Sequence, residues 1–285
     1  MHSTPNVLVG PAGWSYADWK GIVYPPELPA KVHPVEFLAP YFDLIEINSS
    51  FYRPTPPHHC RTWIAKSAVN PEFVFAYKLW QRFTHERAVW PNAEEIAQVR
   101  SGLDVLSDAN KLCALLIQFP WSFKRTPESR QWLARVLDEY KSYPIALELR
   151  HTSWERQEVT GELTRRNIAL CGIDQPVFQD SIEPSLPITA QFGYIRLHGR
   201  NREAWFRSDA SRDERYDYLY STEELHPWVE RIAGVQGGLE KVIVVTNNHF
   251  RGQAIANAVE IMRALGRKME NLPASLVEAF PRLAI

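Results

Sequence analysis

The sequence predicts an α/β fold, a single (β/α)8 TIM barrel that occupies residues 1–285 as one domain. Eight short runs rich in aliphatic and β-branched residues recur along the chain, and helical patterns separate most of them. Between Val7 and Val242 these runs repeat about every 34 residues, which suits a strand followed by a crossover helix. No linker interrupts the series. An open, doubly wound sheet is the alternative, but the first turn, GPAGWSY, is not a G-x-G-x-x-G phosphate loop.

The expected strands are short and mostly apolar, as parallel strands covered by helices should be. Two of the helices between them have clear start signals. Residues 126–141 begin with Thr126 as the N-cap and Pro127 at the first helical position, and residues 221–232 have the capping-box spacing of Ser221 and Glu224. In chain order, the strands are expected at Val7–Gly10, Leu44–Asn48, Phe73–Lys78, Cys113–Gln118, Ile145–Arg150, Ile168–Asp174, Tyr194–His198 and Val242–Asn247.

Three further segments favour crossover helices, namely residues 58–69, 91–106 and 252–265. The last of them, GQAIANAVEIMRAL, follows the eighth strand directly. One unit differs from the others. After Asp174 the sequence QPVFQDSIEPSLPITAQFG contains too much proline for a long helix, so we expect an irregular unit after strand six.

The composition is that of an ordinary globular protein, with 45% apolar and 23% charged residues. The formal net charge of −1 provides no overall field that would attract nucleic acid or an anionic membrane. The three cysteines are widely spaced, which is typical of a reducing compartment. The first residues lack the features of a signal peptide, and no apolar run approaches the roughly 20 residues that span a bilayer. We therefore expect a cytoplasmic protein with no membrane partner.

Polar and charged residues recur near the C-terminal ends of the expected strands. Because side chains alternate along a strand, Glu148 and Arg150 share one face, and Leu147 and Leu149 take the other. The apolar face must meet the helices, so the polar face should line the C-terminal mouth of the barrel, where active sites of this fold lie. A purely structural ion-pair network is the alternative. The residues concerned are Glu46, Asn48, Lys78, Gln118, Glu148, Arg150, Asp174, Arg196, His198, Asn247 and Asn248.

Several longer strings resemble the YecE-like family, number 72 among the domain-of-unknown-function families. They are GPAGWSYADWKGIVYP, IEINSSFYRPTP, QFP, ALELRHTSW, YIRLHGR, RYDYLYSTEEL and NNHFRGQAIANA, and they follow one another from about Val7 to about Leu265. The resemblance implies a TIM barrel, in agreement with the strand count. It brings no established reaction, so it assigns no catalytic residue.

The carboxylates at the mouth suggest acid–base catalysis. Two carboxylates in different environments can divide the roles of acid and base, so Glu46 and Glu148 are the expected catalytic pair. His198 is expected to be a proton shuttle, or else a hydrogen-bonded partner of Glu148. No cofactor is expected. A divalent metal is a less favoured alternative, because no diagnostic ligand spacing is present and cations crowd the same ring.

The cations at the mouth predict an anionic ligand. Arg150, Arg196 and Arg200 are the expected clamps, since a guanidinium binds phosphate or carboxylate through two hydrogen bonds. Gly199, in LHGR, should let a ligand approach the backbone, and Gly252, near Arg251, lies at a helix start that favours phosphate. Neutralisation of the mouth carboxylates is the alternative. The residues expected to contact the substrate are Asn48, Lys78, Arg150, Trp154, Asp174, Arg196, Arg200 and Asn248.

Aromatic residues follow many of the expected strands and should form a rim around the same mouth, Trp154 and Trp205 among them. The favoured interpretation is an enzyme that performs acid–base chemistry on a sugar-phosphate or nucleotide-like small molecule. A nucleic-acid-binding protein or phosphodiesterase, similar to the barrel apurinic endonucleases, is the second interpretation. The near-neutral charge is unfavourable to it. A non-catalytic barrel that binds a metabolite is the third.

Overall fold

The structure is a computed structural model that describes residues 6–29, 31–205, 207, 209–235 and 238–284. All paired strands run parallel, in a four-stranded sheet of order β1-β9-β8-β7 and a five-stranded sheet of order β2-β3-β4-β5-β6. The strands are β1 (Asn6–Pro11), β2 (Leu44–Ile47), β3 (Val74–Lys78), β4 (Leu112–Gln118), β5 (Ile145–Glu148), β6 (Ala169–Leu170), β7 (Gly172–Asp174), β8 (Phe192–Leu197) and β9 (Lys241–Thr246).

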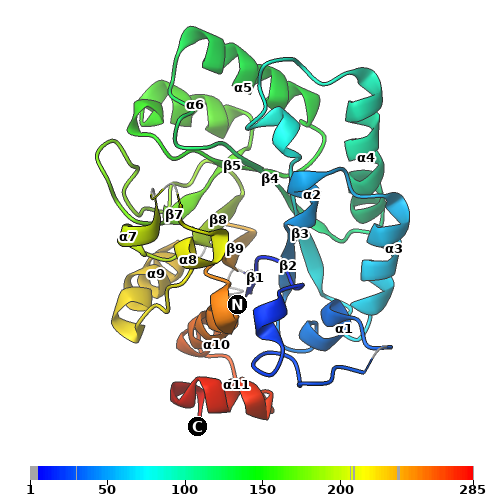
Figure 1. The fold of residues 1–285 in the computed structure, drawn as a ribbon. Helices are drawn as coiled ribbons and strands as arrows, with labels where there is room; N and C mark the ends of the chain where they lie inside the picture. The colour runs from blue at the N-terminus through cyan, green and yellow to red at the C-terminus, as the bar shows by residue number, and fades with distance from the viewer. Residues whose placement is uncertain (1–5, 30, 206, 208, 236–237, 285) are drawn as a thin grey trace.

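The two sheets adjoin at both of their edges. Between β1 and β2, the amide of Asp43 donates to the carbonyl of Val9 at 3.1 Å, and the amide of Gly13 donates to the carbonyl of Glu46 at 2.8 Å. At the other seam only Cys171 separates β6 from β7, and its amide donates to the carbonyl of Leu147 at 2.9 Å. Hydrogen bonds thus link the strands in the order in which Figure 1 shows them around the centre of the molecule, an arrangement compatible with the predicted barrel.

The predicted α/β alternation is confirmed, with differences of at most two residues at the strand ends. The expected sixth strand contains an interruption at Cys171 and forms both β6 and β7. Four strands end before the predicted terminal residue. The polar residues that were assigned to those strand ends, Asn48, Arg150, His198 and Asn247, lie just beyond β2, β5, β8 and β9.

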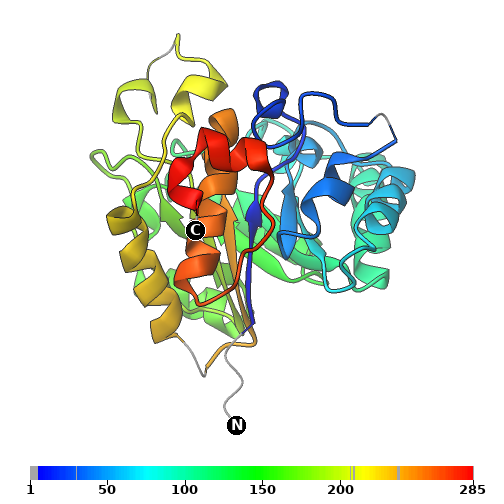
Figure 2. The ribbon, with the colours of Figure 1, turned by 90° about the horizontal axis from the view of Figure 1, so that it is seen from below.

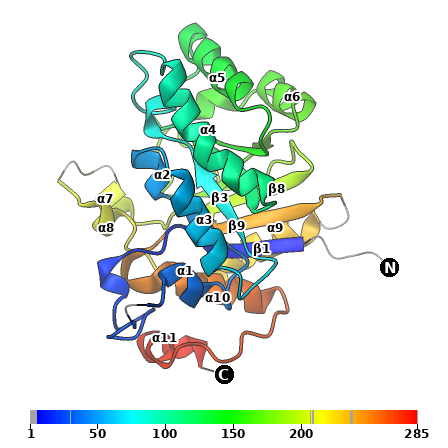
Figure 3. The same cartoon turned by 90° about the vertical axis from the view of Figure 1, so that its right-hand side faces the viewer.

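Helices lie outside the strands, as Figures 1 and 3 show. The two predicted start signals are confirmed: Thr126 caps α5, and Ser221 and Glu224 form a capping box on α9. Between β7 and β8, where every residue is described, no helix forms, as the prolines predicted. The helices are α1 (Pro34–Leu38), α2 (Ser49–Tyr52), α3 (Pro57–Lys66), α4 (Ala93–Asp108), α5 (Pro127–Glu139), α6 (Gln157–Arg165), α7 (Arg202–Trp205), α8 (Arg212–Arg215), α9 (Thr222–Gly234), α10 (Gln253–Ala264) and α11 (Ala274–Ala279), with short 3-10 turns η1 (Ala17–Trp19), η2 (Gln81–Phe83), η3 (Thr152–Trp154), η4 (Phe250–Gly252) and η5 (Pro281–Leu283).

Small side chains fill much of the space that the strands enclose. They form a cluster separate from the larger core between strands and helices. Alanines in place of the usual Val, Ile and Leu leave room for long polar side chains further along the same strands. The cluster contains Ala12, Leu44, Ala76, Cys113, Ala114, Leu116, Ala146, Ala169, Cys171, Ile173, Phe192, Tyr194, Ile243 and Val245.

The C-terminal ends of the strands are covered by segments distant in sequence. Figure 2 shows α7 and α8 (yellow) and the segment after β1 (dark blue) at the same end of the molecule. This end carries the candidate site.

Candidate functional site

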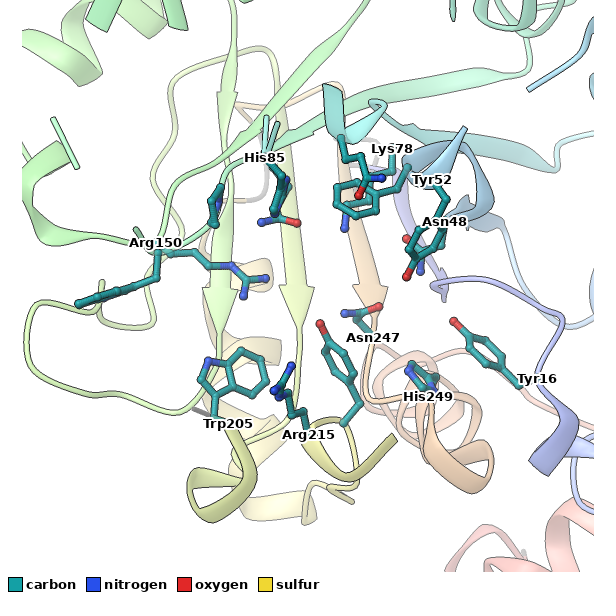
Figure 4. Close-up of a pocket in the computed structure, with 16 residues that line it drawn as sticks. Tyr16, Asn48, Tyr52, Lys78, His85, Arg150, Trp205, Arg215, Asn247 and His249 are labelled. Carbon is teal, nitrogen blue, oxygen red and sulfur yellow. The ribbon is translucent and has the colours of Figure 1, made fainter. Parts of the chain in front are cut away.

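A cavity of about 410 Å³ lies at the C-terminal ends of the strands. Three of its sixteen lining residues carry a positive charge or can do so, namely Lys78, Arg150 and Arg215. Figure 4 shows Lys78 and Arg150 on different sides of the cavity, with Arg215 on a third. Aromatic and amide side chains make up most of the rest, and within the described residues the lining contains no aspartate or glutamate. The cavity is therefore a positively charged site with flat apolar walls.

Beneath the cavity, Arg196 of β8 joins two buried carboxylates. Its Nη2 and Nε contact Oε1 and Oε2 of Glu46 at 2.6 and 3.0 Å, and its Nη1 contacts Oε2 of Glu148 at 2.6 Å. The hydroxyl of Tyr194 donates a further hydrogen bond of 2.8 Å to Glu46. Glu46 and Glu148 are fully buried, and Arg196 is 1% exposed. Burial opposes the charge of Arg196, but the two carboxylates outweigh it and raise its pKa well above the usual range.

Arg150 connects this buried cluster to the cavity. Its Nε and Nη2 contact Oε1 of Glu148 at 2.7 and 2.6 Å, while its side chain keeps 12% exposure and lines the cavity. Burial raises the pKa of Glu148, but the charges of Arg150 and Arg196 outweigh burial and hold that pKa well below its usual range. Glu148 is therefore an ionised counter-charge at neutral pH.

His198 lies in the same cluster but not in the cavity lining. Burial, together with the nearby arginines, lowers its pKa to about 3, so the ring is neutral at physiological pH. The amide nitrogen of Asn247 lies 2.9 Å from Nδ1, and Oε1 of Glu148 lies 3.3 Å from Nε2. Nη2 of Arg150, which can only donate, lies 3.2 Å from the same Nε2, so the contacts with Glu148 and with Arg150 call for opposite roles of this nitrogen. His198 therefore contacts both Asn247 and Glu148. Of these two, Asn247 lines the cavity.

Lys78 ends β3 and reaches into the cavity. Its Nζ lies 4.2 Å from the centre of the Phe51 ring, and no hydrogen bond or ion pair to another described residue is found for it. Burial lowers its pKa to about 7, and the charge of Arg196 adds to the effect, against the opposing effect of Glu46 and Glu148. Lys78 therefore gains or loses its proton near neutral pH.

The comparisons with known proteins place these features in a family. The sequence matches a family model described as "Protein of unknown function DUF72" over residues 8–282. The chain belongs to the DUF72 family. The UPF0759 protein YunF of Bacillus subtilis is 26% identical over 288 residues, which cover 96% of this chain and 100% of YunF. The family resemblance seen in the sequence strings is confirmed.

Solved DUF72 structures are similar throughout the chain. The DUF72 family protein TM1631 of Thermotoga maritima is 32% identical, with a TM-score of 0.80 over 92% of this chain and 100% of that one. The DUF72 family protein EF0366 of Enterococcus faecalis is 22% identical, with a TM-score of 0.78 over 94% of this chain and 98% of that one, and it shares the fold.

In this DUF72 protein, two residues expected to contact the substrate contact each other instead. Arg200 binds both oxygens of Asp174, through Nε at 2.8 Å and Nη2 at 2.7 Å. Tyr220 and Trp228 donate the remaining hydrogen bonds to the carboxylate, at 2.9 and 2.7 Å. The bond to Asp174 is the main reason that the pKa of Arg200 lies above its usual range. Neither Asp174 nor Arg200 lines the cavity, and their polar groups serve a structural network.

Two further expected contacts also lie away from the cavity. Trp154 packs in parallel on Phe123 and donates to its carbonyl at 2.6 Å. Asn248 is fully buried and donates to the carbonyl of Tyr218 and to Asn257, each at 2.8 Å. Asn48, in contrast, lines the cavity as expected, and its buried Oδ1 has no hydrogen-bond partner within the described residues.

The two glycines of the expected phosphate site make room for protein side chains. Both have positive φ, +89° at Gly199 and +78° at Gly252. A Cβ atom at Gly199 would come within 2.7 Å of Tyr218, and one at Gly252 within 2.8 Å of Val23. Gly252 does precede a helix, α10, but the space beside it is occupied by Val23, so close packing explains these glycines without a ligand.

Sequence reasoning missed several cavity residues. Asn247 was expected at the mouth, but Asn248 was chosen as the substrate contact, although strand alternation favours Asn247: Ile243 and Val245 point inward, so residue 247 must do so too. Arg215 and Tyr216 come from loop and helix segments after β8, where no periodic signal exists. Tyr16, one of the aromatic residues expected at the rim, also lines the cavity, and its ring stacks on that of His249 with the ring centres 4.3 Å apart.

Two kinds of feature are absent from the described residues. No group of three or more His, Cys, Asp and Glu side chains is placed to hold a metal ion there. None of the helices in that part of the chain combines the length and the apolar character needed to cross a bilayer. Cys60, Cys113 and Cys171 are buried and form no disulfide.

Proposed function

We propose that the cavity is the active site of an enzyme that performs acid–base chemistry on an anionic small molecule, of the sugar-phosphate or nucleotide kind. The observation that supports this best is the lining itself, which has three basic side chains and no carboxylate among its described residues. Such a site attracts an anion and repels a metal cation.

The charge balance beneath the cavity strengthens the proposal. Arg196 and Arg150 are matched by the two buried carboxylates of Glu46 and Glu148. Lys78 and Arg215, in contrast, form no ion pair within the described residues, and the buried Nε of Arg215 has no hydrogen-bond partner there. An anion in the cavity would supply partners for both, as buried polar groups normally require.

The walls suit a flat or cyclic ligand. Phe51, Tyr52, Trp121, Trp205 and Tyr216 all line the cavity. Faces of aromatic rings stack on sugars and bases, while the guanidinium and amide groups between them fix the orientation of a phosphate or hydroxyl group. A sugar phosphate or a nucleotide has both a ring that can stack and a phosphate that can be oriented.

In this proposal Lys78 takes the acid–base role that the sequence favoured for Glu46 and Glu148. The oxygens of both carboxylates already accept charged hydrogen bonds, so the two residues act as fixed counter-charges. The neutral ring of His198 holds Asn247 in place. Lys78, with a pKa of about 7, can accept or give a proton at physiological pH at little cost.

A ligand screen tests the proposal. Purified protein is heated with phosphorylated sugars, nucleotides, inorganic phosphate and short oligonucleotides at two salt concentrations. A ligand at 100 times its Kd should add about 2.7 kcal/mol of stability. We expect small phosphate compounds to raise Tm, Arg215→Ala to weaken their binding at least tenfold, and Arg61→Ala, which removes an exposed charge on α3, to have no effect.

Three outcomes would oppose the proposal in whole or in part. If no anionic compound stabilises the protein, the cavity is not an anion site. If only oligonucleotides do so, with affinity that falls steeply as salt rises, a nucleic-acid-binding function replaces the small-molecule one. Binding of a phosphate compound without turnover of it by the wild-type protein would support binding alone and remove the acid–base part.

A further inference from the structure

Lys78 places its amine in the cavity and forms no ion pair with any other residue that the structure describes. The two carboxylates that lie deepest beneath it, Glu46 and Glu148, are already bound to Arg196 and Arg150. Its nearest ring, Phe51, faces Nζ at 4.2 Å and provides no proton acceptor. An amine in such a place loses its proton easily and can then act as a nucleophile.

The other titratable groups near Lys78 support the neutral amine. Arg196 and Arg150 disfavour a second positive charge beside them, and Glu46 and Glu148 only partly compensate. His85, whose ring packs edge-on against Phe51 at 4.8 Å, is itself neutral, because burial and the charge of Lys78 lower its pKa to about 3. Glu46 and Glu148, the carboxylates of this set, are offset by burial and by the two arginines, so they do not keep Lys78 protonated above neutral pH.

We propose that Lys78 captures the substrate through a carbonyl group, as an imine, so that the substrate class is an anionic aldehyde or ketone. This inference rests on the proposed function and makes it more specific. The anionic end of the substrate would lie toward Arg150 and Arg215, on other sides of the cavity from Lys78 in Figure 4.

The step balances without a further reagent. The lone pair of Nζ attacks the carbonyl carbon, the C=O π electrons move to oxygen, and one proton passes from nitrogen to that oxygen to give a carbinolamine. A second proton, taken from solvent, then lets the oxygen leave as water while the nitrogen lone pair forms the C=N bond, which gives the protonated imine; loss of the remaining N–H proton to solvent gives the neutral imine. One water is released for each imine formed, and the protonated imine can withdraw electrons from the neighbouring carbon.

Asn48 is placed to assist this step. It lines the same cavity, and its buried Oδ1 lacks a hydrogen-bond donor within the described residues. The hydroxyl of a carbinolamine is a donor that a carbonyl substrate acquires only after attack by the amine. A hydrogen bond from it to Asn48 would satisfy this oxygen.

Reductive trapping tests the inference. The wild-type protein is incubated at pH 7 with pyridoxal 5′-phosphate, an anionic aldehyde, reduced with sodium borohydride, and digested for mass spectrometry. The chain has nine lysines. We expect Lys78 to be labelled at least about tenfold faster than the others, because about half of its amines are neutral at pH 7 against roughly one in a thousand or fewer for an ordinary lysine.

Matched controls separate the amine from the anion site. Lys78→Arg should abolish the rapid label, and Lys241→Arg should not, although Lys241 also lies over a phenylalanine ring, that of Phe192, at 5.6 Å near the opposite end of the strands. Inorganic phosphate should slow labelling of the wild-type protein, and so should Arg215→Ala. Pyridoxal, which lacks the phosphate, should react several-fold more slowly.

Two results would overturn the inference in distinguishable ways. If the label spread evenly over the lysines while phosphate compounds still raised Tm in an Arg215-dependent way, Lys78 would not form the imine. The proposed function would still hold. An even label together with no stabilisation by any anion would remove both.

Discussion

Arg196 and Glu46 form a two-point ion pair in the interior of the fold, with Nη2–Oε1 and Nε–Oε2 distances of 2.6 and 3.0 Å. The pair crosses from one sheet to the other, because Arg196 lies on β8 and Glu46 on β2. Glu148, on β5, accepts the remaining contact of the same guanidinium. The four-stranded and five-stranded sheets are thus joined through their interior as well as at their edges.

We expect Arg196→Met to lower the free energy of unfolding by about 3–5 kcal/mol, because it leaves the buried Glu46 without its guanidinium partner and removes one of the two guanidinium partners of Glu148. Adding Glu46→Gln should restore part of the loss, since the buried negative charge is removed and the amide oxygen still accepts from Tyr194. Urea denaturation of both single variants and the double variant measures the coupling. A double variant less stable than Arg196→Met would contradict this account.

Arg200 and Arg215 should separate stability from binding. Arg200→Ala removes charged hydrogen bonds to the buried Asp174, and we expect a loss of about 1–3 kcal/mol in the free energy of unfolding with no change in phosphate affinity. Arg215→Ala should lower the affinity for phosphate and leave the free energy of unfolding nearly unchanged. Calorimetric titration with a phosphate ligand and urea denaturation of each variant measure the two effects. If Arg200→Ala lowered the affinity for phosphate as much as Arg215→Ala, Arg200 would bind the anion, as the sequence predicted.

Much of the site followed from strand alternation. Glu46, Glu148, Arg150, Arg196 and His198 were expected on the inner face, and the structure brings all of them together beneath one cavity. Alternation works there because Glu46, Glu148 and Arg196 lie within continuous strands, and because Arg150 and His198 follow the ends of β5 and β8 within two residues.

The predictions went wrong where alternation was not followed to the end of a strand, and where a loop rather than a strand places the residue. Asp174 ends a strand whose inward residues are Ala169, Cys171 and Ile173, so its side chain must point outward, to the helix side. Arg215 approaches the cavity from α8, a short helix placed by its own tertiary contacts. Neither periodicity nor composition carries that information.

Lys78→Met should stabilise the protein at pH 6, by about 1–3 kcal/mol, because a charge that burial disfavours is removed. The folded pKa of about 7 lies below the unfolded value, so the unfolded chain binds more protons between pH 7 and about 10.5. The stability of the wild type therefore rises over that range relative to the variant. When Tm is measured from pH 6 to pH 10, the difference in Tm between the wild type and the variant should become smaller as pH rises. Lys241→Met provides the control, and a constant difference would contradict the pKa.

The rate at which pyridoxal 5′-phosphate labels Lys78 should rise with pH and level off above a midpoint near 7. Only the neutral amine attacks, and its fraction grows until the proton is lost. An ordinary lysine would show no midpoint below about pH 10. Glu148→Gln removes a negative charge near Lys78 and should therefore lower the midpoint. Arg150→Lys keeps a positive charge there and should change the midpoint less. A midpoint that moved upward in Glu148→Gln would show that the buried carboxylate does not act on this amine.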